Sequence, residues 1–181
     1  MNGRLSPRME LQDLLIACCK SFEATGLSFA LAGGFAYGIH VEPRATMDID
    51  FCVVSGHEAE GVSRALHEVF EKVIPHKKPM IFGQVSLYRY VGLRGGSEFV
   101  ADLLEPHNAA YSESIIDRKN MIGFGEYSIP VISIEDLYIL KKLSSRKRDA
   151  VDCEMIEESF PSLINDEYIK TWFKKLVRPG E

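Results

Sequence analysis

Two aspartates in the segment TMDIDFCVV, residues 46–54, constrain this chain more than any other feature. An apolar run follows them, which is typical of a buried strand, and successive strand residues point to opposite faces of a sheet. Asp48 and Asp50 therefore project to the same side. Like charges side by side repel, and burying either one without a partner costs several kcal/mol. We therefore expect a positively charged group between these two carboxylates.

Composition narrows the class of protein. A chain of 181 residues, 46% hydrophobic and 26% charged, predicts one soluble domain, or one domain with a small appended unit. The net charge of −5 argues against non-specific nucleic-acid binding. No apolar run approaches the ~20 residues of a membrane span, and the first residues lack a signal-peptide core. We expect a cytoplasmic location, no membrane partner and free thiols at the four cysteines.

Hydrophobic periodicity predicts alternating helices and strands. Helical spacing marks residues 9–24, 35–41, 57–70, 133–145, 147–160 and 165–177, whereas strand patterns mark 27–34, 48–54, 80–93, 97–106 and a small hairpin over 121–132. Gly95-Gly96 supplies a hairpin turn between two of these strands. Residues 108–119 fit either a helix or a long loop. Ser133 and Asp136 resemble a helix capping box in which Asp replaces the usual Glu.

These elements predict an α/β (α+β) chain with a small mixed sheet flanked by helices. We expect an α/β core over residues 1–132 and a helical portion over 133–181 that packs on it. Several other site classes are absent from the sequence. The five histidines have no zinc-site spacing, and there is no P-loop motif and no Gly-x-Ser-x-Gly motif.

Two further features come from other parts of the chain. Gly33 and Gly34 stand where a strand ends and a helix begins, which suits either a phosphate-binding turn or a plain tight turn. Asp102 lies in a strand pattern between Ala101 and Leu103, where an aspartate can also simply bond to a backbone amide or face solvent.

Together the three features resemble the nucleotidyltransferase superfamily typified by DNA polymerase beta. That pattern is Gly-[Gly/Ser], a spacer of about a dozen residues, Asp-x-Asp on a strand and a later carboxylate on another strand. The stretch LAGGFAYGIHVEPRATMDIDF, with its Arg-x-Thr-x-Asp-Ile-Asp, is most similar to the minimal bacterial AbiEii-like nucleotidyltransferases of toxin–antitoxin and phage-defence operons. The later ISIEDLYILKKLSSRKRDAVD also resembles their helical segment, so the resemblance covers roughly residues 28–155.

The resemblance implies an enzyme, a transferase that moves a nucleoside monophosphate from a nucleoside triphosphate such as ATP to a hydroxyl. It implies two divalent ions, Mg²⁺ or Mn²⁺, as cofactors, because two such ions can stabilise both the attacking and the leaving oxygens. Asp48, Asp50 and Asp102 are the expected metal ligands and catalytic residues. On this reading the positive group between the paired carboxylates is metal, and Gly33 and Gly34 give backbone amides to the phosphates.

Basic residues are expected to complete the nucleotide pocket. Arg44 could contact a phosphate, or bridge to Asp48 or Glu42. Thr46 is a second nucleotide-binding candidate, although a hydrogen bond to the loop backbone is the simpler role. Lys141 could reach phosphate from its helix, or belong to a solvated basic helix end. The acidic residues that follow, Asp149 and Asp152, are expected to pair with nearby basic residues at helical spacing.

Two functions from different classes stay open. One is the enzyme, whose acceptor could be a protein side chain, an RNA 3′ end such as that of tRNA, or a small molecule. The alternative is a catalytically inactive module that binds nucleotide or a partner, including an antitoxin that neutralises a cognate toxin.

Overall fold

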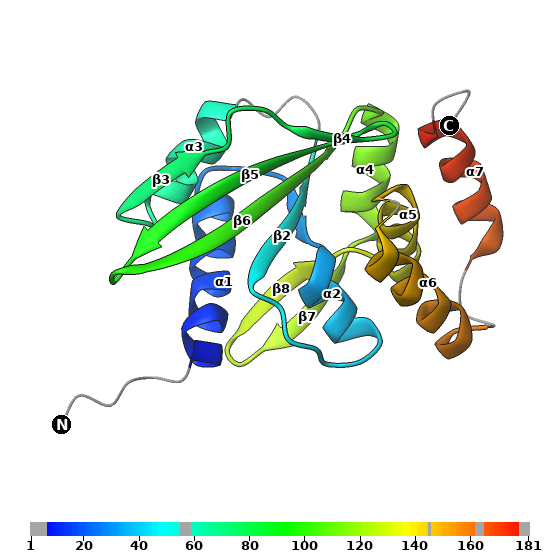
Figure 1. The fold of residues 1–181 in the computed structure, drawn as a ribbon, viewed down its shortest axis with the longest axis horizontal. Coiled ribbons are helices and arrows are strands. Elements are labelled where there is room, and N and C mark those ends of the chain that lie inside the picture. The colour runs from blue at the N-terminus through cyan, green and yellow to red at the C-terminus, as the bar shows by residue number, and fades with distance from the viewer. Residues whose placement is uncertain (1–6, 55–58, 145, 162–164, 178–181) are drawn as a thin grey trace.

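A mixed eight-stranded sheet forms the centre of the computed structural model, which describes residues 7–54, 59–144, 146–161 and 165–177 (Figure 1). The strand order is β3-β5-β6-β2-β1-β8-β7, with β4 paired to β5. Strands β2 and β6 are parallel, as are β1 and β8, and the other pairs are antiparallel. The strands are β1 (Phe29–Leu31), β2 (Asp48–Val53), β3 (Lys72–Pro75), β4 (Met80–Phe82), β5 (Val85–Arg94), β6 (Ser97–Pro106), β7 (Asn120–Phe124) and β8 (Tyr127–Val131).

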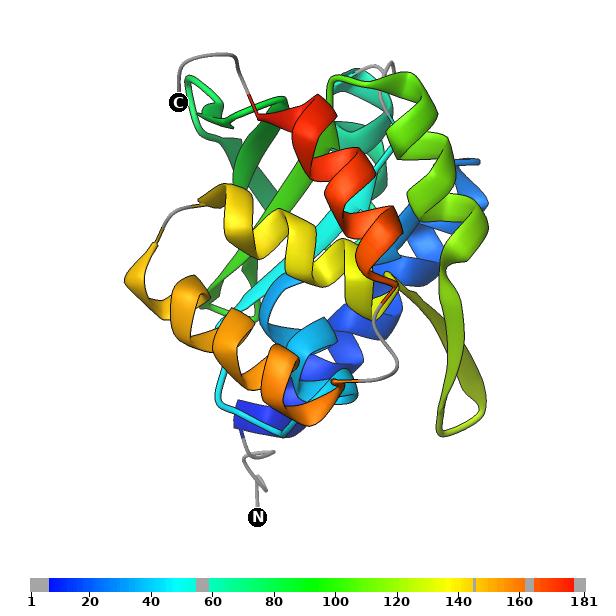
Figure 2. The same ribbon diagram turned by 90° about the vertical axis from the view of Figure 1, so that its right-hand side faces the viewer.

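Seven helices surround this sheet within the described residues. They are α1 (Pro7–Ala24), α2 (Gly33–His40), α3 (Ala59–His67), α4 (Ala109–Arg118), α5 (Ile134–Ser144), α6 (Lys147–Ser159) and α7 (Asp166–Leu176). Helix α1 lies behind the sheet in Figure 1 and packs against α3, whereas α2 lies in front of it and contacts β2 and α5. Figure 2 shows α5, α6 and α7 gathered together beside the sheet. The expected mixed sheet with flanking helices is confirmed.

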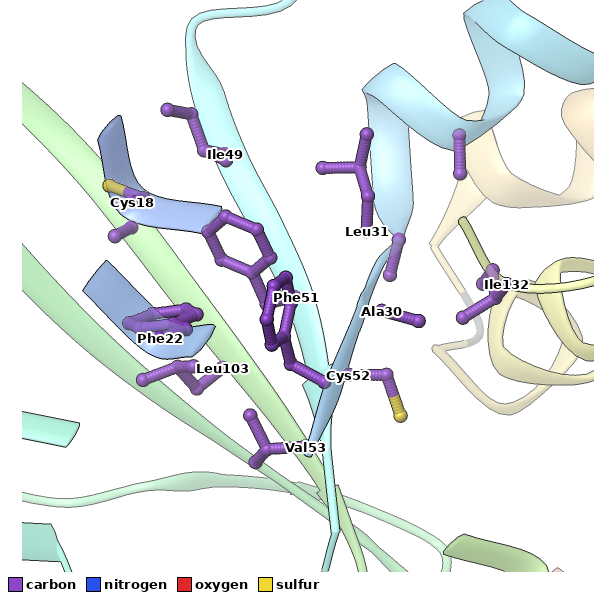
Figure 3. Close-up of a cluster of buried hydrophobic side chains, with 14 of the residues drawn as sticks. Cys18, Phe22, Ala30, Leu31, Ile49, Phe51, Cys52, Val53, Leu103 and Ile132 are labelled. Atoms are coloured by element: carbon purple, nitrogen blue, oxygen red, sulfur yellow. The ribbon is translucent and has the colours of Figure 1, made fainter. Parts of the chain in front are cut away.

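The hydrophobic core fixes which face of β2 carries the carboxylates. Phe51 packs edge-to-face on Phe22 of α1, with ring centroids 4.9 Å apart. Figure 3 shows Ile49, Phe51 and Val53 on the side of α1, while Cys52 points the opposite way. Because side chains alternate along a strand, Asp48 and Asp50 share the face of Cys52, away from α1.

Two strand predictions need correction, and one open alternative is settled. The segment 80–93 is not one strand, because Gly83 takes a φ of +52° and turns the chain between β4 and β5. Strand β3 was not anticipated from the sequence. Residues 108–119 form helix α4 rather than a loop, and the Asn108 side chain caps it by accepting from the Tyr111 backbone N–H at 3.1 Å.

Helices α5 and α7 are attached to the rest by polar and backbone contacts. Ser133 accepts from the backbone N–H of Asp136 at 3.2 Å and donates its hydroxyl to the Asp136 carboxylate at 2.6 Å, so the Asp-containing cap forms. The Tyr168 hydroxyl of α7 donates to the same carboxylate at 2.8 Å. At the end of α7, the carbonyl of Leu176 accepts from the backbone N–H of Gln84 at 3.0 Å. The first contacts hold α5 and α7 together, and the bond from Gln84 links the end of α7 to the chain between β4 and β5.

All four cysteines are buried free thiols. Among the described residues no helix has the length and apolar character needed to span a membrane.

Candidate active site

Three carboxylates from two neighbouring strands come together on the sheet face opposite α1. Asp48 and Asp50 flank the buried Ile49 on β2, and β6 runs parallel beside them with Asp102 directly opposite Asp50. The side chain of Asp102 is 3% exposed, whereas that of Asp48 is 42% exposed. The structure therefore joins the three aspartates of the sequence motif, with Asp102 at the buried end and Asp48 at the open end.

Asp50 carries negative charge that the protein compensates only weakly. Burial of the carboxyl group, together with the nearby carboxylates of Asp102 and Asp48, raises its pKa to about 6, although the Gly34 backbone N–H and Arg146 act in the opposite direction. The Gly34 N–H lies 3.3 Å from Asp50 Oδ2. Within the described residues no ion pair reaches this carboxylate. Asp50 is thus a position where an added cation would be stabilised.

The two glycines form the turn that faces Asp50. Gly33 begins α2 with a φ of +57°, and a Cβ atom there would lie 1.9 Å from Asp50 Oδ2. A Cβ atom on Gly34 would lie 2.7 Å from Thr46 Oγ1. Only glycine therefore lets the start of α2 pack this closely against the carboxylate and the β2 loop. Close packing is a structural reason for both glycines, independent of any phosphate.

Arg89 of β5 is the positive partner of two of the aspartates. Its guanidinium donates to both oxygens of Asp102, from Nε at 2.9 Å and from Nη2 at 2.6 Å, and Nη2 also reaches Asp48 Oδ2 at 3.4 Å. The hydrogen bonds to Asp102 raise the pKa of Arg89. Arg89 therefore binds Asp48 and Asp102, and not the pair Asp48 and Asp50 between which the sequence argument expected a positive group. The metal expected between those two carboxylates stays a prediction.

Sequence reasoning missed Arg89, although the signal was present. A two-residue hairpin at Gly95-Gly96 pairs Arg94 with Ser97 and, counting outward, Arg89 with Asp102. Residues directly opposite in an antiparallel pair point to the same face. The hairpin that the sequence predicted therefore already placed Arg89 beside Asp102.

A second charged cluster lies between α5 and α6. Lys141 is 6% exposed and donates to Asp149 at 3.0 Å and to Asp152 at 2.6 Å. Asp149 also accepts from Arg146 Nε at 2.7 Å and from the Ser144 hydroxyl. Burial opposes ionisation of Asp149, but these donors outweigh it and lower its pKa. Lys141 is therefore a buried ion-pair partner and not part of a solvated basic helix end.

Arg44 joins this cluster from the loop before β2. Its Nη1 lies 2.5 Å from Asp152 Oδ1, and its guanidinium stacks 4.5 Å from the Tyr37 ring centroid. Among the described residues Arg44 pairs with Asp152, and not with Asp48 or Glu42 as the sequence suggested. Asp149 forms the expected ion pair at helical spacing, with Arg146 three residues earlier. Asp152 instead pairs with Lys141, which lies on a different helix.

Thr46 forms the hydrogen bond to the loop backbone that was the simpler of its two expected roles. Its hydroxyl donates to the backbone carbonyl of Asp48 at 3.2 Å and holds the entry to β2.

The glycine turn and the second cluster line one cavity of about 40 Å³. Gly33, Asp50, Lys141, Ser144 and Asp149 all line it. Leucine and valine side chains of β5, β6 and α5 form much of the remaining lining. This space is far smaller than a nucleotide, so it marks where Asp50 and Lys141 approach each other and does not enclose a whole ligand.

The carboxylate set fits a divalent cation in part. Hard cations prefer carboxylate oxygens, and Asp48 and Asp50 supply them from one strand face with little cationic compensation at Asp50. Asp102 does not fit in the same state, because Arg89 engages both of its oxygens. In line with this, the described residues contain no group of three metal-ligating side chains arranged to hold an ion together.

Solved structures share this fold. The antibiotic-resistance factor ANT(2″)-Ia superposes with a TM-score of 0.60 at 10% identity, over 92% of this chain and 91% of that one. A Helicobacter pylori protein gives 0.58 at 18% identity, over 94% and 78%. A Thermotoga maritima protein gives 0.54 at 13% identity, over 97% and 99%. The last two are provisionally described as nucleotidyltransferases, and at these identities the likeness shows the fold.

The sequence itself matches a family. No curated protein matches the chain. The family model described as "Nucleotidyl transferase AbiEii toxin, Type IV TA system" matches residues 15–178, which includes every candidate site residue named above. The chain therefore belongs to the AbiEii nucleotidyltransferase family and is a transferase of that class.

Proposed function

We propose that the protein transfers a nucleoside monophosphate from a nucleoside triphosphate to an acceptor hydroxyl, with Mg²⁺ or Mn²⁺ as cofactor. One observation carries the proposal. Asp48 and Asp50 on β2 and Asp102 on β6 share one face, and the Gly33–Gly34 turn packs directly on Asp50. A carboxylate cluster beside the start of a helix suits a metal-bound triphosphate.

The reaction is a displacement at the α-phosphorus. The acceptor oxygen forms a bond to that phosphorus, the bond to the β-phosphate bridging oxygen breaks, and pyrophosphate leaves. Divalent cations would stabilise the charge on the attacking and leaving oxygens. Asp48 and Asp50 would hold the nucleotide-bearing cation, and Asp102 would accept the acceptor hydroxyl proton or complete the second cation position.

The basic cluster is proposed to bind the phosphates. Lys141 lines the same cavity as Gly33 and Asp50, and two aspartates hold its ammonium group in place. Arg44 and Thr46 lie in the loop that enters β2, next to the Gly34 backbone. A triphosphate that enters from the Asp48 side would meet the glycine amides first and Lys141 beyond them.

The acceptor and the biological context are proposed at the level of class. A protein side chain, an RNA 3′ end such as that of tRNA and a small molecule are all hydroxyl acceptors that suit the chemistry. ANT(2″)-Ia was solved in complex with adenylyl-2″-tobramycin, a nucleotidylated small molecule. The description of the matched family names a toxin–antitoxin system, so we propose a cognate partner protein as well.

One observation favours a second candidate. Arg89 neutralises Asp102, the carboxylate expected to act on the acceptor. A module in which this pair is permanent would bind nucleotide or a partner protein without catalysis.

A transfer assay separates the two candidates. The protein is incubated with each α-³²P-labelled triphosphate, Mg²⁺ and a cell lysate, and the labelled product is identified as protein, RNA or small molecule. We expect one labelled class that disappears with Asp48→Asn. If the protein binds triphosphate but no acceptor class becomes labelled, the binding module replaces the enzyme.

A further inference from the structure

Arg89 and a cation compete for the same two oxygens. The guanidinium binds Asp102 through two donors, which is the geometry of a bidentate charge-assisted pair. A divalent ion at Asp102 needs those oxygens and would bring like charge against the arginine. Arginine stays protonated at every pH that a folded protein tolerates, so a pH change does not dissolve the pair by neutralising it. A competing anion, in contrast, offers Arg89 a new partner and can draw it away from Asp102.

The position of Arg89 suits such an exchange. The Asp102 carboxylate is deeply buried, but the Arg89 side chain is 36% exposed. Its Nη2 already extends past Asp102 to Asp48 at the open end of the carboxylate group, where the distance lengthens to 3.4 Å. The guanidinium therefore spans from the buried carboxylate to the side where an anionic ligand would enter. Phosphate oxygens offer the same bidentate geometry as a carboxylate.

We propose that Arg89 is an exchangeable counter-ion: it holds Asp102 in the free protein and moves to the phosphates of an incoming triphosphate, which releases Asp102 to a divalent cation. This proposal rests on the proposed function, because it assumes a triphosphate and a cation at these carboxylates. Its consequence is a coupling between the two ligands through one arginine of the chain. Each ligand raises the affinity for the other, and by linkage the effect is reciprocal.

The exchange predicts two effects of opposite sign in one variant. In Arg89→Gln, Mn²⁺ titrated without nucleotide and followed by electron paramagnetic resonance should bind about tenfold more tightly than in wild type. In the same variant, a non-hydrolysable triphosphate analogue titrated in EDTA should bind about tenfold more weakly, because a charged hydrogen-bond donor to phosphate is lost. A positive charge that stays in place would also produce these opposite shifts in Arg89→Gln, through charge alone. It would leave both affinities unchanged in Arg89→Lys, which keeps the charge but not the bidentate fork.

Two further variants control for charge and for folding. Arg94→Gln removes the same charge from the exposed end of β5 and should leave both affinities at wild-type values. Arg89→Lys keeps a positive charge on the sheet but cannot donate two parallel hydrogen bonds to Asp102. It therefore allows the measurement to be made even if Arg89→Gln does not fold. It should shift both affinities in the same directions as Arg89→Gln, by a smaller factor.

The outcomes separate this proposal from the proposed function. Opposite shifts in Arg89→Lys, with Arg94→Gln unchanged, support the exchange. If wild type binds the Mn²⁺–triphosphate analogue but the metal affinity of Arg89→Lys without nucleotide is unchanged or lower, the exchange is overturned and the proposed function stands. Wild type that binds no triphosphate analogue at any Mn²⁺ concentration overturns both.

Discussion

At the scale of single residues, the contact between Asp50 and the Gly33–Gly34 turn accounts for the residue types at both places. The half-buried carboxylate needs donors or cations, and the turn gives it one backbone N–H and no side chain. Position 33 combines two constraints, a positive φ and a contact that leaves no room for a Cβ atom. These constraints can be measured separately, because other glycines of the chain share only the first.

Gly33→Ala should destabilise the protein more than Gly125→Ala. Both positions have positive φ, +57° and +64°, but a Cβ atom on Gly125 would meet nothing within 4 Å. We expect about 1–2 kcal/mol for the backbone conformation at either site. At Gly33 the displaced Asp50 side chain should add about 1–3 kcal/mol. Urea unfolding of the two variants measures the difference. Equal losses in the free energy of unfolding would show that the Asp50 side chain moves aside without a measurable cost.

The raised pKa of Asp50 predicts a pH window. Its ordinary value is 3.8 and the folded value is about 6. Between these values the folded protein keeps a proton that the unfolded chain has released, so stability falls as pH rises from about 4 to 6 and then levels off. Asp50→Asn lacks this loss. Its stability relative to wild type should therefore rise across the window by up to about 3 kcal/mol, at about 1.4 kcal/mol per pKa unit. Thermal melts of both proteins at pH 4 to 7 test this, and parallel profiles would contradict it.

At the scale of elements, a buried ion cluster connects α5, α6 and the loop before β2. Lys141 is the centre of this cluster, and Arg44 reaches it through Asp152. The arrangement sets the distance between the helical portion and the carboxylate face of the sheet. Both the nucleotide-binding role proposed for Lys141 and the stability of the helical portion depend on it.

Lys141→Ala should cost about 3–5 kcal/mol of stability, because removal of one partner leaves buried carboxylates without their cation. Its sequence neighbour Lys142 is the matched control. That side chain is 39% exposed and lies 3.4 Å from Glu157, so Lys142→Ala should cost less than about 1 kcal/mol. Chemical denaturation measures both. A loss at Lys141 no larger than at Lys142 would mean that Arg44 and Arg146 alone satisfy the two aspartates.

Element by element, the sequence predicted what depends on local pattern. Alternation placed Asp48 and Asp50 on one face, and the hairpin turn at Gly95-Gly96 formed as expected. The pairing of Asp152 with Arg44 spans 108 residues and depends on the loop conformation before β2, which no periodicity encodes. The split at Gly83 was missed because its positive φ breaks a pattern that reads as one continuous strand.

At the scale of the whole molecule, the division into residues 1–132 and 133–181 stays a prediction about packing. Contacts cross that boundary at several points. Tyr111 of α4 packs against Trp172 of α7 with ring centroids 5.0 Å apart and the rings tilted by 42°, and Leu176 is fully buried. Contacts of this kind couple the helices to the sheet, which favours unfolding as one unit.

We therefore expect a single unfolding transition. Trp172 is the only tryptophan of the sequence and reports on α7, whereas far-ultraviolet circular dichroism reports on the helices and strands together. The two signals should give the same midpoint in urea. An earlier fluorescence transition would show that the helical portion unfolds independently of the α/β core.

The central claim is that the three aspartates transfer a nucleotide, and Asp102 tests it most directly. A binding titration and a labelled-transfer assay are run on the same preparations of wild type and Asp102→Ala. We predict that the variant binds the metal–triphosphate within a few-fold of wild type, while its transfer rate falls by at least ~10²-fold, because the lost group acts in the transition state. Tight nucleotide binding by both proteins, with no transfer by either, would contradict the account.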